Sequence, residues 1–224
     1  NCIPAIDYPT VSFNDIANGQ TFTIDALELK SLFDQTLFAT SDKESRPVLT
    51  GLNFKCDGNT LEVVATDTYR LTKKVVRLQD SLEFNVTIPK NALDDVNKIV
   101  EVGQLVKVNV SDKKVSFDLG DCNINTRVIS GTYPDTSRLI PNEFTQVLKI
   151  ATKELVGAVD RASILLTEKN NVVKLNMDNE EVFVSSKSME VGYVVEKLNE
   201  YSYQGEKLTI SFSAKYLLDA IRAL

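Results

Sequence analysis

The sequence predicts an α+β fold of repeated domains, each with two helices packed on antiparallel β-sheets. Three observations support this prediction. Landmarks recur about every 125 residues, four stretches have the apolar spacing of a half-buried helix, and the segments between them alternate apolar and polar residues. Internal periodicity of this kind is typical of a structure built from copies of one module.

The repeat is visible in three pairs of segments that agree on one period. The pairs are residues 22–29 with 148–155, 84–88 with 208–212, and Tyr8-Pro9 with Tyr133-Pro134, at offsets of 126, 124 and 125. Each repeat also divides into halves, because the apolar positions that begin at Leu29 recur 64 residues later at Leu93.

This period divides the chain into parts of three units. Residues 1–18 are expected to close one unit, 19–141 to form a complete one, and 142–224 to open a third that stops at its second helix. The chain begins with Asn1 rather than Met, and both ends fall inside a unit. We therefore expect a fragment of a longer protein.

Each predicted helix carries one apolar stripe with the spacing i, i+3, i+4, i+7. The four stripes run from Leu29 to Leu37 through Leu32, Phe33 and Thr36; from Leu93 to Val100 through Val96; from Leu155 to Leu166 through Ala158, Val159 and Ala162; and from Leu217 to Leu224 through Ala220 and Ile221. Asp25, three residues before Glu28, predicts an N-cap for the first helix, and Thr152 and Ser213 are expected to cap the third and fourth.

Between the helices the apolar period changes to two, which is typical of half-buried strands. Val106–Val110 and Val115–Leu119 alternate in this way, with a polar turn at Asp112-Lys-Lys between them. Asp57-Gly58-Asn59 and Asp178-Asn179 predict further hairpin turns. Half a unit then has the order strand, helix, strand, strand, strand.

Composition sets limits on function. The 224 residues are 43% hydrophobic and 25% charged, and no apolar run reaches the 18 or so residues that cross a bilayer. We therefore expect a cytosolic protein with no membrane partner. The odd number of widely spaced cysteines, Cys2, Cys56 and Cys122, argues against a disulfide framework or a zinc site.

Catalysis is not expected. The absence of histidine removes the most common general base and metal ligand, and the chain has neither a GxxxxGK[ST] nor a GxGxxG loop. Asp67 or the pair Asp94-Asp95 could hold Mg²⁺, but these residues fall in a turn and on a polar helix face. We therefore predict a non-catalytic protein with no metal and no cofactor.

Four segments carry a resemblance to a known family, and they lie in order along nearly the whole chain. Residues 39–54, 64–71, 130–141 and 208–224 resemble the bacterial DNA polymerase III beta subunits, the sliding clamps. The resemblance implies a DNA clamp fold, in which two protomers of three similar domains join head to tail into a ring around duplex DNA.

On the family's map, residues 1–18 are the end of domain 1, 19–141 the middle domain, and 142–224 a C-terminally truncated domain 3. The implied function is to tether the replicative polymerase for processive DNA replication, in the bacterial cytoplasm at the nucleoid. The implied partners are double-stranded DNA held without sequence specificity, the DNA polymerase III alpha subunit, the clamp loader, other polymerases and repair proteins, with a homodimer when the protein is full length.

The net charge of −6 and the pI of about 4.9 argue against nucleic acid when taken alone. A sliding ring resolves this conflict, because threading retains it and each additional phosphate contact strengthens salt-dependent binding. The family resemblance makes Lys43 and Arg46, in the loop after the first helix, and Lys90, at the start of the second, the candidates for DNA contact.

The family also binds short, largely apolar peptides from its partners, in a pocket between its middle and third domains. The matching positions in this chain are Leu49, Thr66, Thr68, Tyr69, Arg70, Leu71, Pro134, Arg138 and Leu139. Aliphatic side chains suit the floor of such a pocket, and arginine and hydroxyl groups suit its rim. Tyr69 stands where the family commonly has histidine, so the preferred peptide is expected to differ at the rim.

Two other classes of function stay open at this point. One is a repeat-built scaffold that binds proteins without contacting DNA. The other is a carboxylate-metal hydrolase, which would need several acidic side chains converging in one cleft.

Overall fold

The computed structural model describes residues 19–167, 171–188 and 190–224, so the expected domain end at residues 1–18 lies outside the described residues. The chain divides into two compact units, Asn1–Tyr133 and Pro134–Leu224. The boundary expected from the repeat, between residues 141 and 142, stays a prediction. Among the described residues, no helix is both long and apolar enough to cross a membrane.

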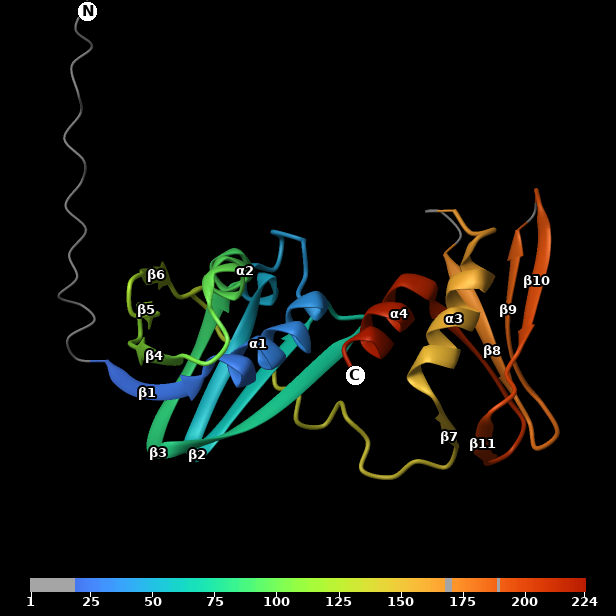
Figure 1. Ribbon diagram of the computed structural model, residues 1–224, viewed down its shortest axis with the longest axis horizontal. Helices are drawn as coiled ribbons and strands as arrows, with labels where there is room; N and C mark the ends of the chain where they lie inside the picture. Colours follow the sequence, from blue (N-terminus) through green and yellow to red (C-terminus); the bar gives the residue numbers. More distant parts are fainter. Residues whose placement is uncertain (1–18, 168–170, 189) are drawn as a thin grey trace, which may run out of the picture. The chain divides into compact units, whose positions relative to one another are not determined.

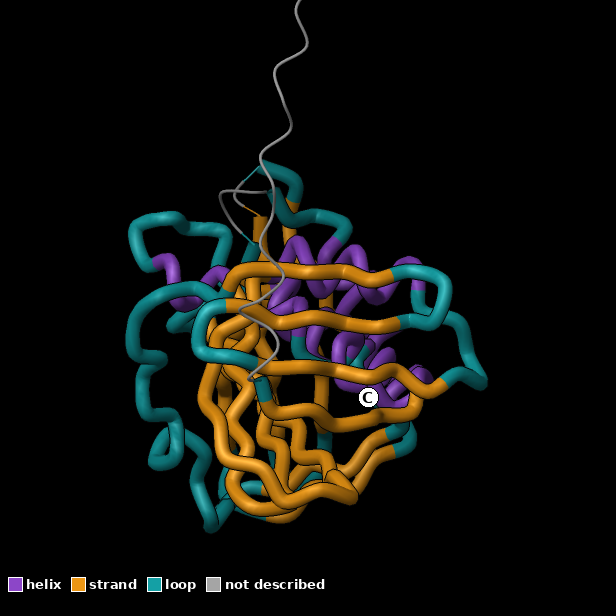
Figure 2. Tube along the Cα trace, turned by 90° about the vertical axis from the view of Figure 1, so that its left-hand side faces the viewer, coloured by secondary structure: helices purple, strands orange, loops and turns teal. Residues whose placement is uncertain are grey.

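In its described part, from residue 19 on, the first unit combines two α-helices with six strands (Figure 1). Its elements are β1 (Gln20–Asp25), α1 (Ala26–Asp34), the 3-10 helices η2 (Leu37–Ala39) and η3 (Pro47–Thr50), β2 (Gly51–Thr66), β3 (Leu71–Pro89), α2 (Lys90–Ile99), β4 (Leu105–Val110), β5 (Lys114–Asp118) and β6 (Asn123–Arg127). One antiparallel sheet has the order β1-β4-β5-β6, and β2 and β3 form a long antiparallel ribbon. In Figure 2 the strands of the four-stranded sheet lie side by side at the front of the view.

The second unit repeats this plan with shorter strands. Its elements are β7 (Val147–Ile150), α3 (Thr152–Ser163), β8 (Val172–Met177), β9 (Val182–Ser188), β10 (Gly192–Lys197), β11 (Tyr201–Gln204), β12 (Leu208–Ser213) and α4 (Ala214–Arg222). The main sheet has the antiparallel order β10-β9-β8-β12, and β11 pairs with β7. The helices pack in pairs, α1 with α2 and α3 with α4, which confirms the predicted α+β class.

The repeat is present in the strand pairing as well as in the sequence. The strand that leads into α2 pairs with the strand that follows α1, as at Leu52 opposite Ile88. The strand that leads into α4 pairs in the same way with the strand that follows α3, as at Leu175 opposite Ile210. The first unit differs in one respect, because the predicted strand at 84–88 is the end of the continuous strand β3.

The first helical stripe is buried as predicted, but the helix is shorter. Leu29, Leu32 and Phe33 lie on α1 and are at most 1% exposed. Thr36 and Leu37, expected on the same helix, lie beyond its end, where the chain tightens into a 3-10 turn. The hydroxyl of Thr36 donates to the carbonyl of Leu32 at 2.6 Å, so this buried polar group is satisfied.

The stripes of the later helices are confirmed in part. Leu93 and Val96 on α2 are buried, as is Val100 at its C-cap. On α4 the predicted Ile221 is buried, but Leu218 rather than Leu217 is buried with it. Adjacent leucines satisfy the helical spacing equally well, so the sequence alone does not separate these two faces.

The outer ends of the last two predicted stripes lie beyond their helices. Leu166 follows the end of α3, and Leu224 follows the end of α4 with 92% of its surface exposed. Ala220 is on α4 but is exposed.

Two of the three predicted caps are confirmed. The carboxylate of Asp25 accepts from the N–H of Leu27 at 2.8 Å, and the hydroxyl of Ser213 accepts from the N–H of Tyr216 at 3.5 Å. The cap predicted at Thr152 is wrong. Ala151 occupies the N-cap with extended backbone, and Thr152 is already the first residue of α3, from which position its side chain makes no cap bond.

The predicted turns at 112–114 and 178–179 are confirmed by the hairpins β4–β5 and β8–β9. In the second turn Asp178 accepts hydrogen bonds from the N–H groups of Glu180 and Glu181, both at 2.9 Å. These bonds, first that from Glu181, hold the pKa of the Asp178 carboxyl below its ordinary value.

The hairpin turn predicted at Asp57-Gly58-Asn59 is wrong. Strand β2 continues through it, and the pairing register with β3 shifts between Gly58 and Thr60. Gly58 has a φ of +62°, which a glycine adopts without steric cost. The segment is therefore a bulge in a continuous ribbon, where Asn59 on β2 and residues 78–81 on β3 fall outside the register, rather than a reversal of the chain.

Leu32→Ala should destabilise the first unit by about 2–5 kcal/mol, because it leaves a cavity under α1 where the leucine is 0% exposed. Leu27→Ala on the same helix is the matched control, since Leu27 is 60% exposed and its loss should change stability by less than about 0.5 kcal/mol. Urea denaturation followed by circular dichroism measures both. Equal losses in the two variants would contradict the assignment of the buried face.

Candidate functional site

The first unit brings its predicted site residues together on two loops. The first, which we call the cation loop, is residues 41–49 between η2 and β2, and it carries Lys43, Arg46 and Leu49. The second, the β2–β3 loop, is residues 66–71, and it carries five of the predicted peptide-binding residues: Thr66, Thr68, Tyr69, Arg70 and Leu71. The two loops are separated in the sequence, but Lys43 of the first contacts Tyr69 of the second.

Backbone hydrogen bonds close the cation loop on itself. The N–H of Ser41 donates to the carbonyl of Leu49 at 2.8 Å. Within the loop, the N–H of Arg46 donates to the carbonyl of Lys43 at 3.3 Å, and the N–H of Leu49 donates to the carbonyl of Arg46 at 3.0 Å. The side chains of Lys43 and Arg46 are exposed, whereas Leu49 is 2% exposed at the base of the loop. One closed loop therefore holds two predicted DNA contacts and one predicted peptide contact.

The third predicted DNA contact reaches the same loop from α2. The ammonium of Lys90 lies 3.9 Å from a carboxylate oxygen of Asp42. The Asp42 side chain is 90% exposed, and an ion pair this accessible contributes little stability. Lys90 thus reaches the loop that carries Lys43 and Arg46, where Asp42 pairs with it.

Asp67 organises the β2–β3 loop. One of its carboxylate oxygens accepts from the N–H groups of Tyr69 and Arg70, at 2.9 and 3.0 Å. The other accepts from Nε of Arg70 at 3.0 Å. The side chains of Asp67 and Arg70 are only 10% and 16% exposed, so this ion pair is partly shielded from water. The Asp67 carboxylate therefore satisfies two backbone donors and also fixes the direction of the Arg70 side chain.

Tyr133 anchors the start of this loop from the far end of the unit. Its hydroxyl oxygen accepts a hydrogen bond from the N–H of Thr66 at 3.0 Å. The hydroxyl of Thr66 in turn donates to the carbonyl of Arg70 at 2.7 Å and accepts from the N–H of Thr68 at 3.1 Å. Burial raises the pKa of Tyr133 to about 12, and the bond from Thr66 offsets part of that rise.

The centre of the β2–β3 loop is strained. Thr68 has a φ of 81°, and it is the one residue other than glycine with a positive φ among the described residues. A β-branched residue adopts this conformation only at a cost that the surrounding bonds must offset. Two bonds supply that restraint: the N–H of Thr68 donates to the hydroxyl of Thr66, and the N–H of Tyr69 donates to the carboxylate of Asp67.

Two cation–π contacts involve these loops, one to η2 and one between the loops. The guanidinium of Arg70 lies over the ring of Phe38, 5.4 Å from its centroid. The ammonium of Lys43 lies over the ring of Tyr69, 5.9 Å from its centroid. Both distances are within the roughly 6 Å over which such contacts are attractive. Tyr69 is 74% exposed, so its ring is also available to a ligand.

The remaining predicted peptide-binding residues belong to the second unit. Pro134 and Arg138 are exposed, and Leu139 is 64% exposed. A turn supports this segment, in which the N–H of Leu139 donates to the carbonyl of Thr136 at 3.1 Å. The assignment of these three residues to a peptide site stays a prediction.

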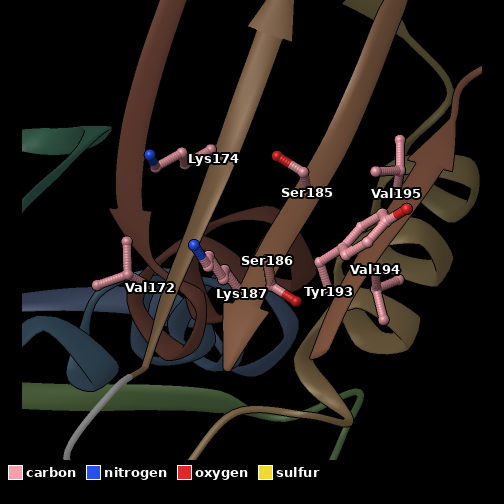
Figure 3. A pocket seen from close by; sticks show the side chains of 8 residues that line it. All are labelled: Val172, Lys174, Ser185, Ser186, Lys187, Tyr193, Val194 and Val195. Carbon is pink, nitrogen blue, oxygen red and sulfur yellow. The ribbon is translucent and has the colours of Figure 1, made fainter. Parts of the chain in front are cut away.

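A separate hollow of about 430 Å³ lies on the second unit (Figure 3). Its lining comes from β8, β9 and β10, and includes Lys174, Ser185, Tyr193 and Val195. None of the predicted site residues lines it. The two loops of the first unit therefore remain the candidate site.

Three supporting residues were not assigned a role from the sequence. Asp67 was considered only as a metal ligand or a turn residue, and its position two residues before Tyr69 is a signal for a side-chain-capped turn. Tyr133 and Phe38 carried no local signal, because their partners lie far away in the sequence. Among the described residues, no group of three or more Cys, Asp or Glu side chains lies close enough to hold a metal ion.

Comparison with known proteins places both units in one family. The family described as the central domain of the DNA polymerase III beta subunit matches residues 23–135, and its C-terminal domain matches residues 137–224. The beta sliding clamp of Bacillus subtilis (strain 168) is 38% identical over 229 residues, which cover 100% of this chain and 60% of that protein. That of Staphylococcus epidermidis (strain ATCC 12228) is 38% identical over 213 residues, covering 94% of this chain and 56% of that protein.

Solved structures agree with the sequence comparison. The Bacillus subtilis DNA polymerase sliding clamp superposes with a TM-score of 0.90 at 38% identity, covering 97% of this chain and 58% of that one. The beta subunit from Streptococcus pyogenes also gives 0.90, at 31% identity, covering 97% and 59%. The predicted clamp fold is confirmed, and the chain spans less than two thirds of the length of these relatives.

The anchor at Tyr133 makes the first unit sensitive to alkali. The pKa of Tyr133 is raised from 10.0 to about 12 in the folded chain, so the unfolded chain loses the tyrosine proton at lower pH. Stability is therefore lost as pH rises from about 10 through about 12. Urea denaturation at a series of pH values should show wild type losing more stability over this window than Tyr133→Phe. Parallel curves for the two proteins would contradict the burial of the hydroxyl.

Proposed function

This chain belongs to the DNA polymerase III beta subunit family, and we propose from that membership that the full-length protein is a sliding clamp. In this role it encircles duplex DNA and holds the replicative polymerase on its template for processive synthesis. The observation that carries the proposal is the match of both units, in order, to the central and C-terminal domains of that family. The proposal concerns the longer protein, assembled as a homodimeric ring at the bacterial nucleoid.

A ring that slides has particular electrostatic requirements. Threading supplies its residence on DNA, so the ring needs few phosphate contacts, and a large number would slow its movement. The net charge of −6 is compatible with this requirement. We assign the contacts to Lys43, Arg46 and Lys90, whose charge is moderated by Asp42.

The β2–β3 loop is suited to bind an extended, largely apolar peptide. Tyr69 offers an accessible ring, while Arg70 is held in a fixed direction by Asp67 and Phe38. Rigid side chains lose less entropy on binding than mobile ones, which favours recognition of a short segment. The proposed sources of the peptide are the DNA polymerase III alpha subunit, the clamp loader, other polymerases and repair proteins.

No reaction is assigned to the chain. We propose that catalysis resides in the polymerase and that the clamp acts by raising the polymerase's effective concentration at the primer end.

Retention on circular DNA tests the proposal directly. The full-length protein, loaded onto a nicked circular plasmid by a clamp loader, should remain bound during gel filtration at high salt. Cutting the plasmid once should release it, because free ends allow the ring to slide off. Release that depends on salt but not on cutting would indicate ordinary binding and would overturn the topological role. No retention on either form would favour a scaffold without DNA contact.

Replacing Lys43, Arg46 and Lys90 together by glutamine should weaken binding of the full-length protein to short duplexes and flatten its salt dependence. Each lost phosphate contact reduces the slope of log K against log salt by about 0.9. Lys113→Gln, at an exposed turn between β4 and β5, is the control and should leave the slope unchanged. Fluorescence anisotropy over a salt series measures it. An unchanged slope in the triple variant would reject these contacts.

Arg138→Ala or Leu139→Ala in the full-length protein should weaken peptide binding by about tenfold without lowering the melting temperature. The reason is that both side chains are exposed, so their removal leaves the core intact. Leu105→Ala is the control, because Leu105 is similarly exposed at 69% on β4. Calorimetry with a peptide from the alpha subunit measures the affinity. Equal affinity in all proteins would count against the assignment.

A further inference from the structure

The hollow on the second unit lies on the face of its four-stranded sheet that is turned away from the helices. Glu196 on β10 accepts a hydrogen bond from Arg161 on α3 at 2.7 Å, so its side chain marks the helix side of the sheet. Side chains alternate between the two faces of a strand, so Val195 points to the opposite side. The cross-strand partner of Val195 is Ser185, which places Ser185 and Lys187 of β9 on the same outward face.

This outward face carries positive charge. Lys174 on β8 and Lys187 on β9 line the hollow and are exposed, and among the described residues Lys174 has no ion-pair partner. In the described part of the chain, no outward strand position of this sheet is Asp or Glu, although the whole chain has a net charge of −6. Lys197, a third outward lysine, lies outside the hollow and pairs with Glu181 at 3.4 Å. The hollow is therefore a local cationic site in an acidic chain, which favours an anionic ligand.

Apolar side chains beside the lysines supply a second recognition element. Val172, Tyr193 and Val195 line the hollow and are 42%, 78% and 53% exposed. In Figure 3 the Tyr193 ring lies next to Val195 on β10, with the two lysine side chains on the other side of β9. Exposed apolar surface gains free energy when a partner covers it. A volume of about 430 Å³ is enough for a few side chains of such a partner.

We propose that the hollow docks an acidic peptide segment of another protein, in which carboxylates flank an apolar residue. The carboxylates pair with Lys174 and Lys187, and the apolar side chain covers Val195 and the Tyr193 ring. A nucleic-acid strand suits the hollow less well, because two lysines neutralise few phosphates and valines offer no stacking surface for bases. The inference goes beyond the proposed clamp function, since no residue assigned to DNA or to the clamp peptide lines the hollow.

Fluorescence anisotropy with three labelled peptides tests the class of ligand. The probe is Glu-Glu-Val-Glu-Glu, and its matched partners are Gln-Gln-Val-Gln-Gln, which lacks the charge, and Glu-Glu-Gly-Glu-Glu, which lacks the apolar side chain. The full-length protein at low salt should bind the probe with a Kd below about 1 mM. Each partner peptide should bind about threefold more weakly or less, and added salt should weaken binding of the probe because it screens exposed charges.

Substitutions locate the bound probe. Lys174→Gln should weaken its binding about two- to fivefold, as expected for loss of an exposed charge pair. Lys149→Gln is the matched control, because Lys149 is an exposed lysine on β7, outside this sheet. Val195→Ser should also weaken binding, whereas Val191→Ser should not, since Val191 is 68% exposed but lies outside the hollow. Circular dichroism establishes that each variant is folded.

Several results would overturn the proposal. They are failure of the probe to bind below about 1 mM, equal binding of the three peptides, and equal losses in Lys174→Gln and Lys149→Gln. A loss in Arg138→Ala without one in Lys174→Gln would place the probe at the proposed clamp-peptide site instead. A labelled oligothymidylate that binds more weakly to Lys174→Gln, with no such effect on the peptide, would identify the ligand as nucleic acid. None of these results changes retention of the clamp on circular DNA, so the proposed function is judged separately.

Discussion

Burial of one apolar stripe per helix beneath antiparallel strands is the constraint on which the rest of this structure depends. On α1 and α2 the stripe positions are buried almost completely, from Leu29 and Leu32 to Leu93 and Val96. Because a helix of ten residues or so is marginal alone, its position is set by that packing rather than by its own propensity. The cation loop, which follows α1 and η2, inherits this fixed placement, and it carries part of the candidate site.

The candidate site is organised by two polar side chains, those of Asp67 and Tyr133, that are not among the predicted ligand contacts. Asp67 fixes the backbone of its loop and the direction of Arg70, while Tyr133 holds Thr66 at the end of β2. Together they maintain the strained backbone at Thr68. A surface loop restrained in this way holds its side chains in fixed orientations, which would lower the entropy cost of the proposed peptide binding.

The turn at Asp178 and the caps at Asp25 and Ser213 could be predicted from the sequence, because each depends on residues close together in the chain. The class of fold and the helix pairs could be predicted because the local patterns recur along the chain. The bulge at Gly58 could not, since an Asp-Gly-Asn sequence serves a turn and a bent strand equally well. The site residues were located only through family resemblance. The resemblance did not assign a role to Tyr133 or Phe38, because their contacts join distant parts of the chain.

The bulge at Gly58 has a consequence for how this family can vary in length. Side chains on a strand alternate between faces, so one added or deleted residue inside β2 would turn every buried side chain beyond it toward water. At the bulge the register is already interrupted, between Gly58 and Thr60, and an extra residue there leaves both flanking segments in phase. Evolutionary insertions in this ribbon should therefore accumulate at that point, while the flanking strands keep a constant length.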